Sequence, residues 1–164
     1  MTKTYKGLMI FGILLIGLGG YFITVALASK SWDQVEGKII NTRIPASLSN
    51  SGSTTQRHLV YRVEVTYKYE FDGKNFKNSR FSTGTGNTVE GGFNEKSKAR
   101  EWLKNSDYSI GKKVTVYVNP KDPEMTVLSS GINIGTIMPI ILGLLFFGLG
   151  YALNKFIPKI PKSQ

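Results

Sequence analysis

The sequence predicts a membrane α+β protein in which two transmembrane helices flank one small, mainly antiparallel β domain of about five strands and one short helix. Two uncharged apolar segments, 7–28 and 129–154, lie near the two ends of the chain. Between them, residues 61–70 alternate between apolar and polar side chains, as in a strand with one buried face. Asp72-Gly73 then supplies the residues that a two-residue hairpin turn prefers.

The two apolar segments are long enough to cross a bilayer. The first contains 22 uncharged residues and the second contains 26. At about 1.5 Å per helical residue, each would span a hydrocarbon core of roughly 30 Å. Neither has the polar face that a soluble helix of this length would need. We therefore expect transmembrane helices at 7–28 and 131–153, a β-rich domain at 29–130 and a basic tail at 154–164.

The N-terminal segment also has the three parts of a cleavable secretory signal. A short basic stretch precedes the apolar residues, and Ala26-Leu27-Ala28 forms an A-x-A site before Ser29. The apolar run is longer than the roughly 7–15 residues usual for such signals, which favours a retained anchor. Both interpretations send the middle domain across the membrane.

The charge distribution favours cytoplasmic ends. The middle domain carries 16 of the 21 basic residues and all 11 acidic ones, mixed in sign along the chain, which argues against a nucleic-acid-binding stripe. The flanks contain no acidic residue and five lysines: Lys3, Lys6, Lys155, Lys159 and Lys162. Because cytoplasmic flanks of membrane helices are enriched in Lys and Arg, we expect a multi-pass protein of the cytoplasmic (plasma) membrane, with both termini in the cytoplasm and the middle domain extracytoplasmic.

Turn-forming residues divide the rest of the middle domain. Residues 45–56 and 82–92 are rich in Gly, Ser, Thr and Asn, and we expect flexible loops in both. Asn94 is the expected N-cap of a short helix of about ten residues. The alternating strand 114–118 should end at Asn119-Pro120, since proline donates no hydrogen bond to a ladder.

Three other features of the domain concern its first and last strands. Trp32 could lie at the headgroup level or begin the domain core. Gly37 interrupts the strand pattern of 34–44, which indicates a bulge or a close backbone approach. Pro123 should stiffen the connection that leads to a last short strand at 125–128.

Taken in order, these features resemble the bacterial membrane family called domain of unknown function 3592. The matching residues cover about 32–128 and are Trp32 with Val35-Glu36-Gly37, "YRVEVTYKY", Asp72-Gly73-Lys74, Tyr108 with Gly111, "VTVYVNP", and Pro123 before Leu128. Where the family commonly has a second tyrosine before Asn-Pro, this chain has Val118. The resemblance implies a small β-rich domain that is extracytoplasmic or flanks the membrane, and it implies no reaction.

The sequence offers few residues for catalysis or metal binding. It contains no cysteine and one histidine, His58, at the edge of a polar loop. The carboxylates are scattered, and no two are recognisable as an acid–base pair. Glu36, beside Gly37, is the acid whose burial would be most informative. We expect no enzyme activity, no catalytic residue, no cofactor and no metal site.

Three functional hypotheses remain open. The leading one is a membrane-anchored, non-enzymatic binding or accessory protein, whose partners are the lipid bilayer and a membrane or extracytoplasmic protein. The second is an immunity-like protein that blocks a membrane-targeting toxin through its helices. The third is a membrane-surface hydrolase acting through Glu36 and His58. Small residues also offer faces for a homo-oligomer, namely Gly20, Thr24, Ala28, Gly131 and Gly135.

Overall fold

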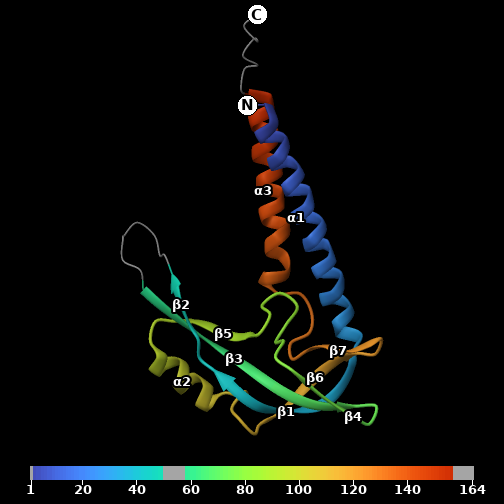
Figure 1. Cartoon of the computed structure of the whole chain (residues 1–164), viewed down its shortest axis with the longest axis vertical. Coiled ribbons are helices and arrows are strands. Elements are labelled where there is room, and N and C mark those ends of the chain that lie inside the picture. Colours follow the sequence, from blue (N-terminus) through green and yellow to red (C-terminus); the bar gives the residue numbers. More distant parts are fainter. Residues whose placement is uncertain (1, 50–57, 157–164) are drawn as a thin grey trace, which may run out of the picture.

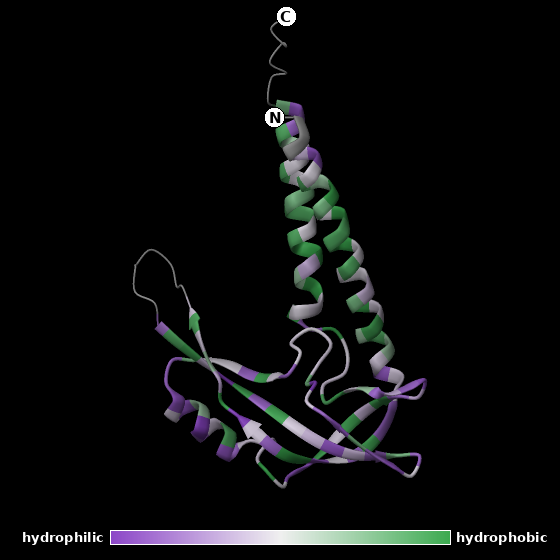
Figure 2. Cartoon of the chain, in the orientation of Figure 1, coloured by the Kyte–Doolittle hydropathy of each residue, from purple (hydrophilic) through white to green (hydrophobic). Residues whose placement is uncertain are grey.

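Two long apolar helices stand side by side at one end of a curled antiparallel sheet (Figure 1). The computed structural model describes residues 2–49 and 58–156. The helices are α1 (Thr2–Ala28) and α3 (Ile134–Phe156), and each is long and apolar enough to cross a membrane. Figure 2 shows apolar residues over most of both helices, whereas the strands mix apolar and polar residues. The predicted arrangement of two apolar helices flanking an antiparallel β domain is confirmed.

The described residues form one sheet of seven strands, two more than the sequence indicated. The sheet order is β2-β3-β1-β6-β7, while β4 and β5 also pair with β3, and all these pairings are antiparallel. The strands are β1 (Asp33–Arg43), β2 (Ala46–Ser49), β3 (His58–Phe71), β4 (Lys74–Asn78), β5 (Thr88–Phe93), β6 (Lys113–Asn119) and β7 (Asp122–Val127). A 3-10 turn, Ser29–Ser31, connects α1 to β1.

The two additional strands lie in segments for which the sequence predicted loops. β2 occupies the start of 45–56, and β5 occupies the end of 82–92. Both pair with β3, which is 14 residues long and has partners along both edges. Pairing with this long strand overrides the turn-forming composition of the two segments. The rest of the first segment, from residue 50, lies outside the described residues.

The hairpin between β3 and β4 is confirmed, including its turn. Phe71 pairs with Lys74, which leaves Asp72 and Gly73 as the two turn residues. Their φ angles are 49° and 71°, the positive values that a type I′ turn requires at both positions.

Gly37 marks a close backbone approach and not a bulge. It pairs with Tyr69 on one side and with Val114 on the other, in the middle of the sheet. A Cβ atom at this position would lie 3.1 Å from the backbone oxygen of Lys68 and 2.5 Å from Cγ2 of Val116, so only glycine fits without a shift. The register shift of β1 lies instead between Ile39 and Asn41.

The turn between β6 and β7 is shorter than the sequence indicated. Asn119 pairs with Asp122, so only Pro120 and Lys121 form the connection. Pro123 therefore lies inside β7, and its carbonyl accepts a hydrogen bond from the Tyr69 hydroxyl (2.6 Å). A proline is tolerated there because β7 pairs with β6 alone within the sheet order and needs no second ladder.

The sheet curls until β7 approaches β4 and the chain that follows it. The Asn78 side-chain amide donates to the carbonyl of Glu124 (2.7 Å). The backbone amides of Leu128 and Ser129 both donate to the carbonyl of Phe81 (2.9 and 2.8 Å). The enclosed core is fully or almost fully buried and contains Ile39, Val63, Val65, Tyr67, Tyr69, Val116 and Val118.

The predicted short helix is present as α2 (Lys96–Asn105), but its predicted cap is wrong. Glu95 occupies the N-cap position, with extended backbone angles and no side-chain bond to the backbone. Its carboxylate instead contacts the Ser97 hydroxyl and Lys98. Trp32 is 8% exposed, which agrees with a core position for this indole.

Candidate functional site

Polar side chains connect the first turn of α3 to the β domain. Asn133 is the residue before the helix, and its side-chain oxygen accepts a hydrogen bond from the Thr136 amide (3.2 Å). The Thr136 hydroxyl in turn donates to the carbonyl of Asn133 (2.7 Å). The side-chain amide of Asn133 also donates to Oγ of Ser82 (3.0 Å). A helix cap is thereby tied to the loop that follows β4.

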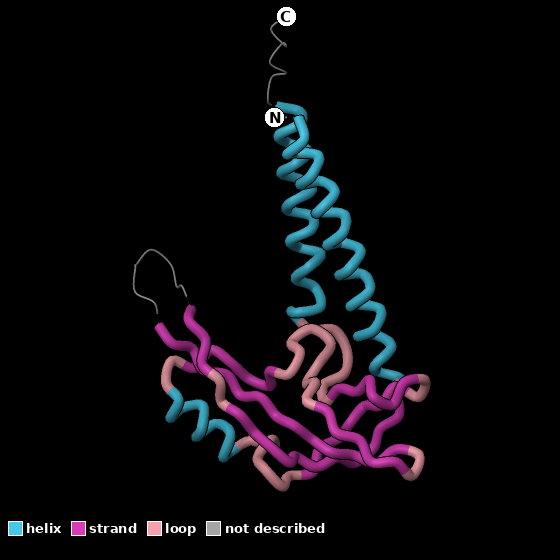
Figure 3. The backbone as a smooth tube through the Cα atoms, viewed as in Figure 1, coloured by secondary structure: helices cyan, strands magenta, loops and turns pink. Residues whose placement is uncertain are grey.

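The start of this loop forms a compact, hydrogen-bonded turn, whereas the flexibility that its glycines indicated stays a prediction. Ser82 is 2% exposed, and its Oγ also accepts from the backbone amide of Thr85 (3.0 Å). The amide of Phe81 donates to the carbonyl of Gly86 (2.6 Å), which closes the turn. Figure 3 shows the loops of this region gathered at the base of α3.

Two glycines allow the turn and α3 to touch through their backbones. A Cβ atom on Gly84 would lie 2.5 Å from the amide nitrogen of Thr136 and 2.7 Å from the carbonyl carbon of Gly135. A Cβ atom on Gly135 would lie 3.0 Å from Cα of Gly84. A Cβ atom on Gly84 would also meet Oδ1 of Asn133. Because the other obstructing atoms are backbone, neither glycine can be replaced without moving the helix relative to the turn.

The end of α1 is attached to the same region. The backbone amide of Gly131 donates to Oγ of Ser29 (3.0 Å), and the Ser29 hydroxyl donates to the carbonyl of Ala26 (2.8 Å). Ser29 is fully buried. We call this set of residues the junction: Ser29, Ser82, Gly84, Gly131, Asn133, Gly135 and Thr136.

Beyond the junction, α1 and α3 contact each other through small residues spaced seven apart. The buried positions are Gly12, Gly19 and Ala26 on α1, and Gly143 and Gly150 on α3. A Cβ atom on Gly12 would lie 2.6 Å from the carbonyl oxygen of Gly143, so the two backbones are in direct contact there. We call these five residues the seam.

The seam uses different residues from the small-residue faces that the sequence indicated for a homo-oligomer. Gly20, Thr24 and Ala28 are exposed on α1. Gly131 and Gly135 belong to the junction, where they lie against Lys30 and Gly84 of the same chain. A homo-oligomer through the exposed face of α1 stays a prediction.

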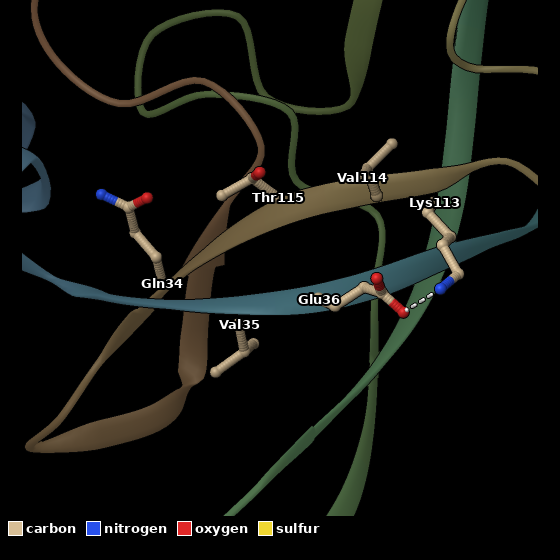
Figure 4. Close-up of a pocket in the computed structure, with 6 residues that line it drawn as sticks. All are labelled: Gln34, Val35, Glu36, Lys113, Val114 and Thr115. Carbon is tan, nitrogen blue, oxygen red and sulfur yellow. Dashed lines mark ion pairs between the residues drawn. The ribbon is translucent and has the colours of Figure 1, made fainter.

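The surface of the β domain has shallow, open hollows. One of about 330 Å³ lies between β1 and β6, and Glu36 reaches across it to Lys113 (2.9 Å; Figure 4). The Glu36 side chain is 64% exposed, so it is not a buried acid. The hollow is therefore an open surface between two paired strands, with the Glu36–Lys113 ion pair exposed to solvent.

Glu36 and His58, the pair on which the hydrolase hypothesis depends, lie far apart. Gly37, next to Glu36, pairs with Tyr69, whereas His58 begins β3 eleven residues earlier. At about 3.3 Å per residue, the strand separates them by roughly 36 Å. The structure therefore does not bring this acid and this histidine together.

Of the 11 carboxylates, all of which lie in described residues, only Glu64 is not exposed. Its two oxygens contact Arg62 (2.9 Å) and Arg43 (3.2 Å), and 13% of its side chain is accessible. Arg62 precedes it by two residues on the same strand face, a signal visible in the sequence. Arg43 comes from the opposing register position on β1, which no local pattern reveals.

The fold and the junction define a class of protein in which a curled β domain is attached by a buried polar contact to a pair of apolar helices. A family model described as Domain of unknown function (DUF3592) matches residues 35–133, more than half of the chain, and the protein belongs to that family. The match begins within β1 and ends at Asn133, so it includes nearly all of the β domain and the residue that caps α3. No curated protein matches the chain.

Proposed function

We propose that the protein is a membrane-anchored, non-enzymatic binding or accessory protein that holds its β domain in a set orientation at the outer face of the cytoplasmic membrane. In this proposal α1 and α3 cross the bilayer as an antiparallel pair. The observation that carries the proposal is the junction. A loose tether would suffice to keep a domain near a membrane, whereas a capped helix, a buried serine and a glycine–glycine contact also fix how the domain is oriented.

The energetics of the junction support this orienting role. Ser29, Ser82 and Thr136 are all buried, and each has a hydrogen-bond partner. A tilt that broke the Ser29–Gly131 and Ser82–Asn133 bonds while these groups stayed buried would leave them unpaired, which costs about 1–3 kcal/mol for each group. Several of these costs together favour one arrangement of domain and helices.

The seam supports a retained N-terminal helix. Gly143 and Gly150 of α3 are buried because α1 covers them. Cleavage after Ala28 would remove that cover and would also break the continuity between Ala26 and the junction residue Ser29. The separation of Glu36 from His58 supports binding over catalysis. The partners that this role needs are the lipid bilayer and a membrane or extracytoplasmic protein.

We expect reporters at both ends of the chain to be cytoplasmic. The start of α1 and the end of α3 lie together, away from the β domain (Figure 1), and the flanking residues are basic. A fluorescent protein that is inactive outside the cytoplasm should therefore be bright when fused to either end. An alkaline phosphatase inserted at Gly73, in the β3–β4 turn, should be active and serves as the control. A dark C-terminal fusion would overturn the two-span arrangement.

We expect Gly84→Ala to loosen the β domain from α3. The new Cβ would meet the backbone of Gly135 and Thr136, which cannot move without displacing the helix. Hydrogen exchange at residues 128–136 of the full chain in micelles should become faster. Gly91→Ala is the matched control, because its Cβ would make ordinary contacts of 3.6 Å with Arg62 and 3.8 Å with Thr88. Equal exchange in the two variants would argue against the junction as the orienting element.

A further inference from the structure

The described end of β2 and the beginning of β3 carry two exposed leucines. Leu48 and Leu59 are directly opposite each other in the register, so their side chains lie on the same face. They are 63% and 47% exposed. Single exposed leucines are common on protein surfaces. Here two of them are adjacent where the described part of β2 ends and β3 begins, and they form one apolar surface.

This part of β2 and β3 lies on the same side of the β domain as the apolar helices. In Figure 1 the described end of β2 lies level with the beginning of α3, and Figure 2 shows apolar residues on β2 and near the start of β3. Ile132 and Ile134 are also exposed, at 46% and 65%, where the chain enters α3. If α3 enters a bilayer there, that level corresponds to the headgroups and the outer ends of the acyl chains.

The charges near the two leucines are compatible with an anionic lipid surface. β2 and residues 58–62 of β3 contain no acidic residue, and this part of β3 ends with Arg62. The nearest carboxylate on β3 is Glu64, which is in contact with both Arg62 and Arg43. A lipid headgroup layer would therefore meet apolar and basic side chains at this part of the two strands.

We propose that Leu48 and Leu59 insert into the membrane interface, so that the β2–β3 hairpin is a further contact between the β domain and lipid. The inference rests on the proposed anchoring of α1 and α3 in the bilayer. The junction and the hairpin then hold the domain at two separated places. The β3–β4 turn and the loop between α2 and β6 point away from the helices (Figure 1) and remain available to a protein partner.

The absence of cysteine from the sequence allows one fluorescent label to be placed at a time. The test variants are Leu48→Cys and Leu59→Cys in the full chain. Ile110→Cys is the matched control, since Ile110 is 65% exposed in the loop between α2 and β6. Ile141→Cys, 48% exposed on α3, reports whether that helix is in lipid. Each variant carries an NBD fluorophore and is reconstituted in vesicles of phosphatidylcholine and phosphatidylglycerol, with and without nitroxide-labelled lipid.

We expect nitroxide lipids to quench the labels at positions 48, 59 and 141 and to leave the label at position 110 unquenched. If position 141 is quenched while 48 and 59 behave like 110, the hairpin inference is wrong and the anchoring proposal stands. If 48 and 59 show blue-shifted emission without quenching, protein covers them instead of lipid, which also overturns the inference. If 141 is not quenched, the anchoring proposal itself fails, and the inference fails with it.

Discussion

Tyr67→Ala should destabilise the β domain by about 3–5 kcal/mol, the range for truncating a buried aromatic side chain. Tyr67 is fully buried in the enclosed core. A loss of this size is a large part of the stability of a small domain, which is of order 5–15 kcal/mol. We therefore expect the β domain of the variant to unfold at a much lower denaturant concentration than that of the parent protein.

Tyr67→Phe isolates the contribution of the hydroxyl. That hydroxyl donates to the carbonyl of Arg80 (2.9 Å), and because it has one proton, the Thr126 hydroxyl at 2.9 Å must donate to it. These two bonds join β3 to β7 and to the chain after β4, where the curled sheet closes. Removing the hydroxyl leaves two partners unpaired in a buried place, and we expect a cost of about 1–3 kcal/mol.

The same variant should change the response to alkaline pH. Burial raises the pKa of Tyr67 above its ordinary value, because the charged phenolate would lose its hydration. In the unfolded chain tyrosine titrates at about pH 10. Below that pH Tyr67 is protonated in both states, and its full contribution to the free energy of unfolding is present. This contribution is lost as the pH rises further, because the unfolded state then releases a proton that the folded state retains. The free energy of unfolding of Tyr67→Phe should therefore fall less steeply at alkaline pH than that of the parent protein.

Denaturant unfolding in micelles, followed by fluorescence, measures all three effects, since both tryptophans, Trp32 and Trp102, lie in the β domain. Tyr117→Phe is the control. Tyr117 is a half-buried residue of β6, and no hydrogen bond of its hydroxyl is found within the described part of the chain. If Tyr67→Phe and Tyr117→Phe unfold at the same denaturant concentration, the closure of the sheet does not depend on the Tyr67 hydroxyl.

The elements that the sequence predicted well are those whose signals are local. Residues 61–70 alternate with a period of two, which indicates a strand without knowledge of its partners. Asp72-Gly73 specifies its turn through backbone conformation alone. The strands β2 and β5 have no such local signal. Both form by pairing with the long strand β3, and such pairing between separate segments cannot be recognised from a local pattern.

The junction could be anticipated only in part. Asn133, followed by Thr136 at the start of an apolar segment, has the local pattern of a helix N-cap, although this pattern was missed. The partners of the cap are not local, because Ser82 precedes Asn133 by 51 residues and Ser29 precedes Gly131 by 102. No periodicity in one sequence specifies such contacts.

The sequence signal of the seam has a different spacing from the small-residue face on which the homo-oligomer prediction rests. Small residues recur every four positions at Gly20, Thr24 and Ala28, and this face is exposed. They also recur every seven positions along the seam, and those positions are buried. A seven-residue repeat keeps one side chain per two turns facing a partner helix, which is the spacing that a close helix pair needs.

Replacing Gly12 and Gly143 together by alanine should separate α1 from α3. Each new Cβ would approach backbone atoms of the other helix, at 2.6 Å from the Gly143 oxygen for position 12 and 2.7 Å from the Gly12 oxygen for position 143. Backbone atoms cannot rotate away, so the helices must move apart. Overpacking of this kind costs about 1–3 kcal/mol for each site.

The matched control replaces Gly17 and Gly20 of α1 by alanine, because a Cβ at either position meets nothing within 4 Å. Alanine favours a helix over glycine by up to about 1 kcal/mol, so the control should be neutral or slightly stabilised. Spin labels at Ile13 and Leu144, both more than half exposed, report the distance between the helices. That distance should increase in the seam variant and stay constant in the control. If it is unchanged in both, the two helices are not held in backbone contact at Gly12 and Gly143, and the antiparallel anchor must be stabilised by its larger side chains instead.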